Sequence, residues 1–427
     1  MSLAFYAWWS VPYLLLLVAV VVLDFWLAAA IGRSQDQRER RVLLVLSLLI
    51  NLGLLFAFKY AGLVAETLNV LGAKIPVIAL VLPIGLSFYT FQSLSYVIDV
   101  YRRHSSPHPS LLSYATYVTM FPHQISGPLV RHNTIIPQLE DASTYRLQTD
   151  NMWRGIFFFV SGLAKKILIA DLLSRGINPV ITGMATASNT EAWLAMLGYT
   201  LQLYFDFSGY SDMATGLCLM LNIRLPQNFD SPYKSASLTE FWQRWHMTLS
   251  SWLRDYLYIS LGGNRGTRWA TYRNLLITMA LGGLWHGATW MFALWGIYHG
   301  LLLAGERAIG FAKNNFNRHL MVAMTFLMVA LGWVLFRSPD MATAGIWYQK
   351  LFLANGSLTW DVASIPIKHR DRYAAALFAG MLLVFWARNT WQIRYLPSRR
   401  NVLALALLFV ICLPFLGDES PFLYFQF

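Results

Sequence analysis

Long apolar runs recur along the whole chain and constrain its fold more than any other feature. A helix that crosses a lipid bilayer needs roughly 20 mostly apolar residues. With a mean hydropathy of +0.46 and only 13% charged residues, this chain of 427 residues is too apolar for an ordinary soluble protein. We therefore predict an all-α polytopic membrane protein with about ten or more helices, some short or re-entrant. The candidate segments are Val11–Ile31, Val42–Phe58, Ile75–Val97, Trp153–Ala170, Ala192–Asn222, Leu275–Trp295, Phe292–Ile309, Leu320–Phe336, Tyr373–Trp386 and Val402–Leu416.

The net charge of +12 is best explained by the membrane topology. In a soluble protein such a charge would suggest nucleic-acid binding, but Lys and Arg accumulate in the cytoplasmic loops of membrane proteins. Basic loops follow the first and third apolar segments, at Arg33–Arg41 and Tyr101–His104. Both loops are cytoplasmic if the N-terminus is extracytoplasmic, and we expect that orientation and no nucleic-acid partner. No Lys or Arg precedes Arg33, so the first segment is not a typical signal peptide and should remain as a helix.

The middle of the chain is interrupted by proline and glycine. Irregular backbone at membrane depth is tolerated only where protein buries it or where it lines a water-filled cavity. We therefore predict short, broken helices around an internal cavity in this part of the chain. The expected breaks are at Pro122, Gly127, Pro128, Pro137, Gly209 and Pro226.

The segment Ser237–Ile259 has apolar residues at helical spacing and predicts an amphipathic helix. Ser237 followed by Glu240 fits a capping box at its start. The helix could lie on the membrane surface or could border the cavity, and the spacing does not separate these alternatives.

Four histidines near the first breaks have ordinary explanations. His104 and His108 have the spacing of a metal-binding pair, but no cluster of ligands follows them, and we expect no metal there. His123 and His132 flank the interrupted stretch ISGPLV and could line a cavity without taking part in chemistry. The two cysteines, Cys218 and Cys412, make neither a disulfide framework nor a zinc site.

His246, in QRWHMTL, and His286, in GGLWHGA, lie in more apolar surroundings. Ionisable groups within a membrane are rare, costly and usually functional. A neutral imidazole that donates to a carbonyl is nevertheless an inexpensive core residue, so the residues alone leave both interpretations open. The flanking glycines Gly282, Gly283 and Gly287 permit the close approach of a substrate, or of a second helix packed through small residues.

The sequence has no nucleophile elbow, phosphate-binding loop or metalloprotease helix. In DFSGYSD, Asp206 to Asp212, two serines lie between two aspartates. This stretch is equally compatible with a polar turn and with a site in which an aspartate pairs with arginine or orients a histidine.

At these residues the chain resembles the membrane-bound O-acyltransferase family, in particular its bacterial branch of alginate O-acetylation and teichoic-acid D-alanylation proteins. The resemblance runs from about Leu82 to Phe427, including the terminal PFLYFQF. Its long ordered blocks are FPHQISGPLVRHNTIIPQL, the stretch from LQLYFDFSGYSD through WQRWHMTL to SLGGNR, and LGGLWHGATWMFALWGIYHG.

The resemblance implies one membrane-embedded domain, 1–427, with a ring of tilted and broken helices around a central tunnel. N-terminal helices (1–100) would precede a catalytic core with re-entrant or short helices (101–300), followed by C-terminal helices (301–427). The invariant histidine of the family falls on His286 and a second active-site histidine on His246. The residues expected to line or brace the tunnel are Trp242, Arg244, Trp245, Asp206 and Trp285.

Acyl transfer to a hydroxyl needs a base and a stabiliser for the tetrahedral oxyanion. We assign the base to His286, which burial should keep neutral, and expect His246 to orient the thioester or donate to the oxyanion. We expect no bound cofactor and acetyl-CoA as the donor, in a bacterial inner membrane. A periplasmic SGNH-type acetyltransferase, encoded in the same operon, would receive the acetyl group and modify an extracytoplasmic polysaccharide.

Two alternatives stay open from the sequence alone. One keeps the fold but transfers D-alanine from a carrier protein to teichoic acid. The other is a polysaccharide or acyl transporter without catalysis, because broken helices and polar groups at the midplane are also features of transporters.

Overall fold

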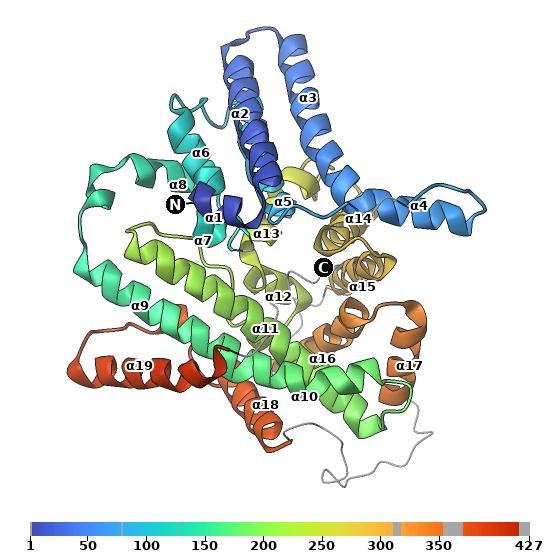
Figure 1. The fold of residues 1–427 in the computed structure, drawn as a ribbon. Helices are drawn as coiled ribbons and strands as arrows, with labels where there is room; N and C mark the ends of the chain where they lie inside the picture. The colour runs from blue at the N-terminus through green and yellow to red at the C-terminus, as the bar shows by residue number, and fades with distance from the viewer. Residues whose placement is uncertain (1, 78–79, 126, 311–316, 353–369, 418–427) are drawn as a thin grey trace. The chain divides into compact units, whose positions relative to one another are not determined.

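A computed structural model describes residues 2–77, 80–125, 127–310, 317–352 and 370–417 of the chain. Every long regular element within these residues is a helix, as the apolar runs predict (Figure 1). The chain forms two compact units, one of Met1–Gly155 with Leu217–Pro226 and the other of Ile156–Gly216 with Gln227–Phe427. The terminal PFLYFQF of the family resemblance lies outside the described residues.

In the first unit, α2 and α3 form an antiparallel pair around a buried carboxylate (Figure 1). Asp24 accepts hydrogen bonds from Ser47 Oγ at 2.7 Å and Asn51 Nδ2 at 2.9 Å. Such partners are needed because a buried polar group without a hydrogen bond is costly. The helices that lie wholly in this unit are α1 (Ser2–Trp9), α2 (Val11–Arg33), α3 (Gln37–Leu55), α4 (Ala61–Val70), α5 (Leu86–Tyr101), α6 (Leu111–Thr119), α7 (Phe121–Gln124) and α8 (His132–Glu140).

The second unit is built around a large apolar core rich in aromatic rings. Trp295, Trp333 and Trp347 are among its largest fully buried side chains. Its helices are α10 (Asp171–Thr182), α12 (Leu238–Arg244), α13 (Met247–Trp252), α14 (Arg268–His286), α15 (Trp290–Ala308), α16 (Arg318–Arg337), α17 (Met341–Phe352), α18 (Arg370–Phe385) and α19 (Arg399–Cys412). Two further helices, α9 (Thr149–Ala164) and α11 (Asn189–Met220), belong in part to each unit.

Within the described residues, three helical segments are long and apolar enough to cross a membrane: Val11–Arg33, Gln37–Val70 and Arg318–Arg337. The second is continuous through a π-helical turn over Phe56–Tyr60. The remaining helices are shorter or more polar than a simple span, which agrees with the expectation of short elements.

Two of the predicted spans are wrong. The run Ile75–Val97 becomes helical only at Leu86, because Pro83 and the left-handed Gly85 precede the helix. The run Leu275–Trp295 is split, since α14 ends at His286 and α15 begins at Trp290. The hydropathy pattern continues across this break, and therefore the pattern could not reveal where α14 ends.

The predicted break at Gly209 is also wrong. Helix α11 runs without interruption from Asn189 to Met220. A Cβ atom on Gly209 would lie 2.7 Å from the carbonyl oxygen of Gly162 on α9, and one on Gly162 would lie even closer to Gly209. The two glycines therefore allow the backbones of α9 and α11 to approach each other closely.

Candidate active site

His286 is the last residue of α14, at the break between two tightly packed helices. A Cβ atom on Gly283 would lie 2.1 Å from the carbonyl oxygen of Phe292, and one on Gly296 would lie 2.2 Å from that of Met279. Only glycine permits α14 and α15 to approach so closely, and Figure 1 shows them side by side. Of the two explanations offered by the sequence, helix packing therefore accounts for Gly283.

His246 lies at a second break, between α12 and α13. The predicted amphipathic helix is therefore not continuous, because the backbone of His246 is left-handed, with a φ of 42°. Ser237 caps α12 as predicted, since its hydroxyl accepts the Glu240 N–H at 3.0 Å. The Glu240 carboxylate accepts from the N–H of Ala236, one residue earlier than a capping box requires.

The two breaks bring His246 and His286 together, with ring centroids 6.3 Å apart. Trp285 contacts both rings edge-on, with centroid distances of 6.0 Å to His246 and 5.2 Å to His286. Trp295 and Phe336 lie against His286 at 5.3 and 5.4 Å. The two imidazoles, separated by forty positions in the sequence, thus share one aromatic enclosure.

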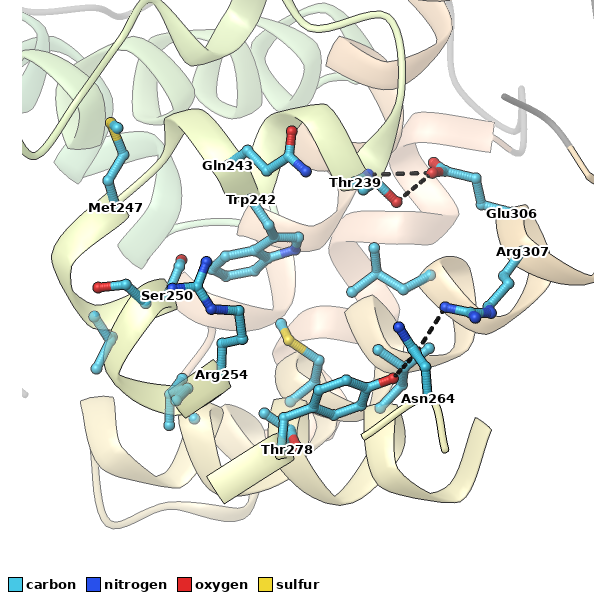
Figure 2. A pocket seen from close by; sticks show the side chains of 18 of the residues that line it. Thr239, Trp242, Gln243, Met247, Ser250, Arg254, Asn264, Thr278, Glu306 and Arg307 are labelled. Carbon is cyan, nitrogen blue, oxygen red and sulfur yellow. Dashed lines mark hydrogen bonds between the residues drawn. The ribbon is translucent and has the colours of Figure 1, made fainter. Parts of the chain in front are cut away.

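His286 also lines a cavity of about 610 Å³ in the second unit. The cavity walls near it are apolar and include Leu253, Met279 and Trp295. Arg254 and Arg307, which are exposed, also line the cavity together with the carboxylate of Glu306, and the two arginines lie on opposite sides of Trp242 in Figure 2. Among the described residues, the cavity is therefore lined by a buried imidazole and by three charged side chains, two cationic and one anionic.

The residues predicted to line or brace a tunnel separate into two groups. Trp242 lines the cavity, whereas Arg244, Trp245, Asp206 and Trp285 are not among its lining residues in the described part of the chain. Arg244 pairs with Glu240 and Asp230 at 3.0 and 3.7 Å. Asp206 is buried and pairs with a lysine, Lys166, at 2.7 Å, whereas the sequence offered an arginine or a histidine as its partner. Trp245 is buried, with its ring 5.0 Å from that of Trp333.

Comparison with known proteins decides the family. The model of the membrane-bound O-acyltransferase family matches residues 1–338. The chain belongs to this family. It is 44% identical to the probable alginate O-acetylase of Pseudomonas aeruginosa, over 85% of the chain and 70% of that protein. It is 34% identical to the peptidoglycan O-acetyltransferase of Helicobacter pylori, over 100% of the chain and 90% of that protein.

A teichoic acid D-alanyltransferase of Bacillus subtilis is a more distant relative. It is 26% identical over 59% of this chain and 68% of its own length. This protein is thus a membrane-bound O-acyltransferase whose relatives transfer more than one acyl group.

Two residues of the site escaped the sequence analysis. His299 of this O-acyltransferase is fully buried, and neither of its ring nitrogens has a hydrogen-bond partner within the described residues. Its ring lies 5.0 Å from Trp295 and 5.2 Å from Trp242. Asn228 accepts a hydrogen bond from His246 Nδ1 at 3.1 Å. His299 could have been noted as a third histidine in a conspicuous block, but nothing in LPQNFDSPY indicated a contact with His246.

The remaining predicted histidines lie in the first unit. His108 pairs with His132 and not with His104, since His108 Nε2 lies 3.1 Å from His132 Nδ1. His132 Nε2 in turn lies 3.3 Å from the carboxylate of Asp99. His123 is buried, with Nδ1 3.2 Å from the side-chain nitrogen of Gln92.

Proposed function

We propose that this O-acyltransferase takes the acetyl group of acetyl-CoA and passes it across the membrane, toward O-acetylation of an extracytoplasmic polysaccharide. The observation that carries the proposal is the cavity that joins His286 to the exposed Arg254 and Arg307. An acyl thioester of coenzyme A fits such a cavity, because its anionic nucleotide end could bind the arginines while its neutral thioester end lies beside His286. Guanidinium groups are well suited to phosphate recognition.

The reaction needs a base at the thioester carbonyl. An imidazole is suited to accept the hydroxyl proton as oxygen attacks, because its basicity is near neutrality. His286 takes this role in the proposal, because it lines the cavity and is surrounded by the aromatic rings of Trp285, Trp295 and Phe336. As the C–O bond forms and the C–S bond breaks, the proton passes from the imidazolium to the departing thiolate.

The remaining elements of the proposal concern the cellular setting. We propose a bacterial inner membrane, an extracytoplasmic N-terminus, a ring of helices around a tunnel, and basic loops on the donor side. A periplasmic SGNH-type acetyltransferase would receive the acetyl group, and a polysaccharide would be its final acceptor. The relative named for alginate supports an exopolysaccharide, and the relative named for peptidoglycan supports the cell wall as the second candidate.

Purified protein in lipid nanodiscs, incubated with labelled acetyl-CoA and its operon partner, tests this function. We expect label on the partner and release of free coenzyme A with the native chain, and neither with His286→Ala. Label transferred equally well by His286→Ala would remove His286 as the base. Transfer from a D-alanyl carrier protein, without transfer from acetyl-CoA, would replace the donor by that of the teichoic-acid branch.

A further inference from the structure

Asn228 lies against His246 and binds it through its side chain. The Asn228 side-chain oxygen accepts from His246 Nδ1 at 3.1 Å and from the Thr248 hydroxyl at 2.8 Å. The Asn228 side-chain nitrogen donates to Ser211 Oγ at 3.3 Å. All of these groups are buried in the second unit.

The position of the amide oxygen follows from its neighbours. The backbone N–H of Thr248 can only donate, and it points at the same Asn228 atom from 3.4 Å. The atom that faces Thr248 and His246 must therefore be an acceptor, the amide oxygen. His246 Nδ1 must then carry the proton, and in the neutral ring Nε2 holds the lone pair.

Asn228 also braces the backbone at the break between α12 and α13. Its carbonyl oxygen accepts the N–H of Met247 at 2.9 Å, and the N–H of Asp230 donates to the Arg244 carbonyl at 3.0 Å. These two bonds flank His246, whose left-handed backbone is unusual for a residue other than glycine. Phe207 of α11 meets the imidazole edge-on at 4.8 Å.

We propose that Asn228 is a positioning residue that holds His246 in the tautomer with Nδ1 protonated and Nε2 as the accepting nitrogen. Three separate motifs meet in this arrangement: Ser211 from DFSGYSD, Asn228 from LPQNFDSPY and His246 from WQRWH. A neutral His246 oriented in this way accepts a hydrogen bond at Nε2 and cannot donate one to an oxyanion. The role of oxyanion donor that the sequence offered for His246 therefore passes to another group.

Titratable and charged side chains approach His246 from two of the helices packed around it. The titratable side chain that faces it from α14 is His286, at 6.3 Å between rings. On α11, Asp206 pairs with Lys166 and Asp212 pairs with Lys165. The contact that bears on the protonation of Nδ1 is its hydrogen bond to the Asn228 amide oxygen at 3.1 Å.

Nitrogen NMR of the full chain in lipid bilayers, with ¹⁵N-labelled histidine, tests the tautomer directly. The His246 signals are assigned by subtraction of the His246→Gln spectrum. We expect a protonated Nδ1 in the native chain and a mixture of tautomers in Asn228→Ala. A native His246 protonated at Nε2, or an Asn228→Ala spectrum identical to the native one, would overturn the proposal. This measurement needs no substrate, so its outcome is independent of the proposed acetyl transfer.

Only the kinetic consequence rests on the proposed function. We expect Asn228→Ala to reduce release of coenzyme A from acetyl-CoA by about 10- to 100-fold, the loss that is typical when the hydrogen-bond partner that orients a metal-bound histidine is removed. Asn228→Asp keeps the acceptor but adds a negative charge that stabilises the imidazolium. Its activity should recover above that of Asn228→Ala at high pH, and the acid limb of its pH profile should move to higher pH.

A matched control is Asn51→Ala, which removes an equally buried amide bound to Asp24. We expect this variant to lower the thermal stability of the protein and leave the pH profile unchanged. If Asn228→Asp showed an unshifted profile, with activity reduced equally at every pH, Asn228 would have only a structural role.

Discussion

The two units both contain buried histidines, but they hold them differently. In the first unit, His132 is fully buried between His108 and the carboxylate of Asp99, and both of its nitrogens are engaged in that chain. In the second unit, His286 lies among aromatic rings at the wall of a cavity. Burial is therefore common to His132 and His286, and a place in the cavity wall distinguishes His286. A histidine with both nitrogens occupied stabilises a fold, whereas one beside a cavity can exchange a proton with a ligand.

The largest expected effect separates these two kinds of histidine. His286→Ala should reduce transfer of labelled acetyl by about 10²- to 10⁴-fold, the usual contribution of a general base. His132→Ala should change the rate per folded molecule by less than about threefold, because it removes no group of the proposed reaction. Single-turnover measurements on both purified variants check this. Equal losses in the two variants would abolish the distinction between the units.

The second effect concerns the glycines that place His286. Gly283→Val would put side-chain atoms onto the Phe292 carbonyl and force α14 and α15 apart. Overpacking of this kind costs about 1–3 kcal/mol, occasionally more. Thermal unfolding in detergent should show the loss, and acyl transfer should fall with it because the break at His286 shifts.

Gly305→Ala on α15 is the control for this substitution. No atom lies within 4 Å of a Cβ placed there, apart from its own helix and chain neighbours. Alanine in an exposed helix interior should stabilise by about 0.5–1 kcal/mol. A Gly283→Val variant as stable as the native chain would show that the two helices tolerate separation.

A third, smaller effect tests the hydrogen-bonded chain of the first unit. His132→Ala leaves the buried carboxylate of Asp99 without one partner, and such losses cost about 1–3 kcal/mol. The melting temperature in lipid nanodiscs should fall, while transfer at low temperature persists. His319→Ala, at an exposed position on α16, should leave the melting temperature unchanged.

Sequence reasoning succeeded where the signal was local and failed where it depended on contacts between distant segments. The apolar runs predicted the helices α2, α11 and α16, and Ser237 predicted the cap of α12. The sequence could not reveal the break after His286, because the apolar run continues past it, or the break at His246, because apolar residues keep helical spacing on both sides of it.

The candidate site shows the same limit. His246 and His286 were selected from their surroundings and from the family resemblance, yet their separation of 6.3 Å follows from the packing of α12–α15. Asn228 was missed because its contribution to the site is a hydrogen bond with His246, which lies 18 positions later in the sequence. Gly209 was read as a helix breaker, since its contact with Gly162 cannot be seen in either local sequence.

The smallest expected effect lies at the rim of the cavity. Arg254 is exposed and paired with Asp255 at 2.7 Å, so solvent and salt weaken its field. Arg254→Ala should raise the KM for acetyl-CoA by about two- to fivefold, less at high salt, and leave kcat unchanged. Arg399→Ala, at an exposed site on α19, is the matched control. A large fall in kcat for Arg254→Ala would place this arginine close to the reacting atoms.

The close packing of α14 against α15 means that one part of the cavity wall tolerates no substitution by larger residues, whereas another part can be redesigned. The wall that carries His286 is held by backbone contacts at Gly283 and Gly296, where any added side chain collides. Leu253, which follows α13, also lines the cavity and packs against α14, where its side chain lies 3.0 Å from where a Cβ of Gly282 would be. Redesign toward longer acyl donors should therefore begin at Leu253. A smaller residue at Leu253 would enlarge the cavity and leave His286, α14 and α15 in place.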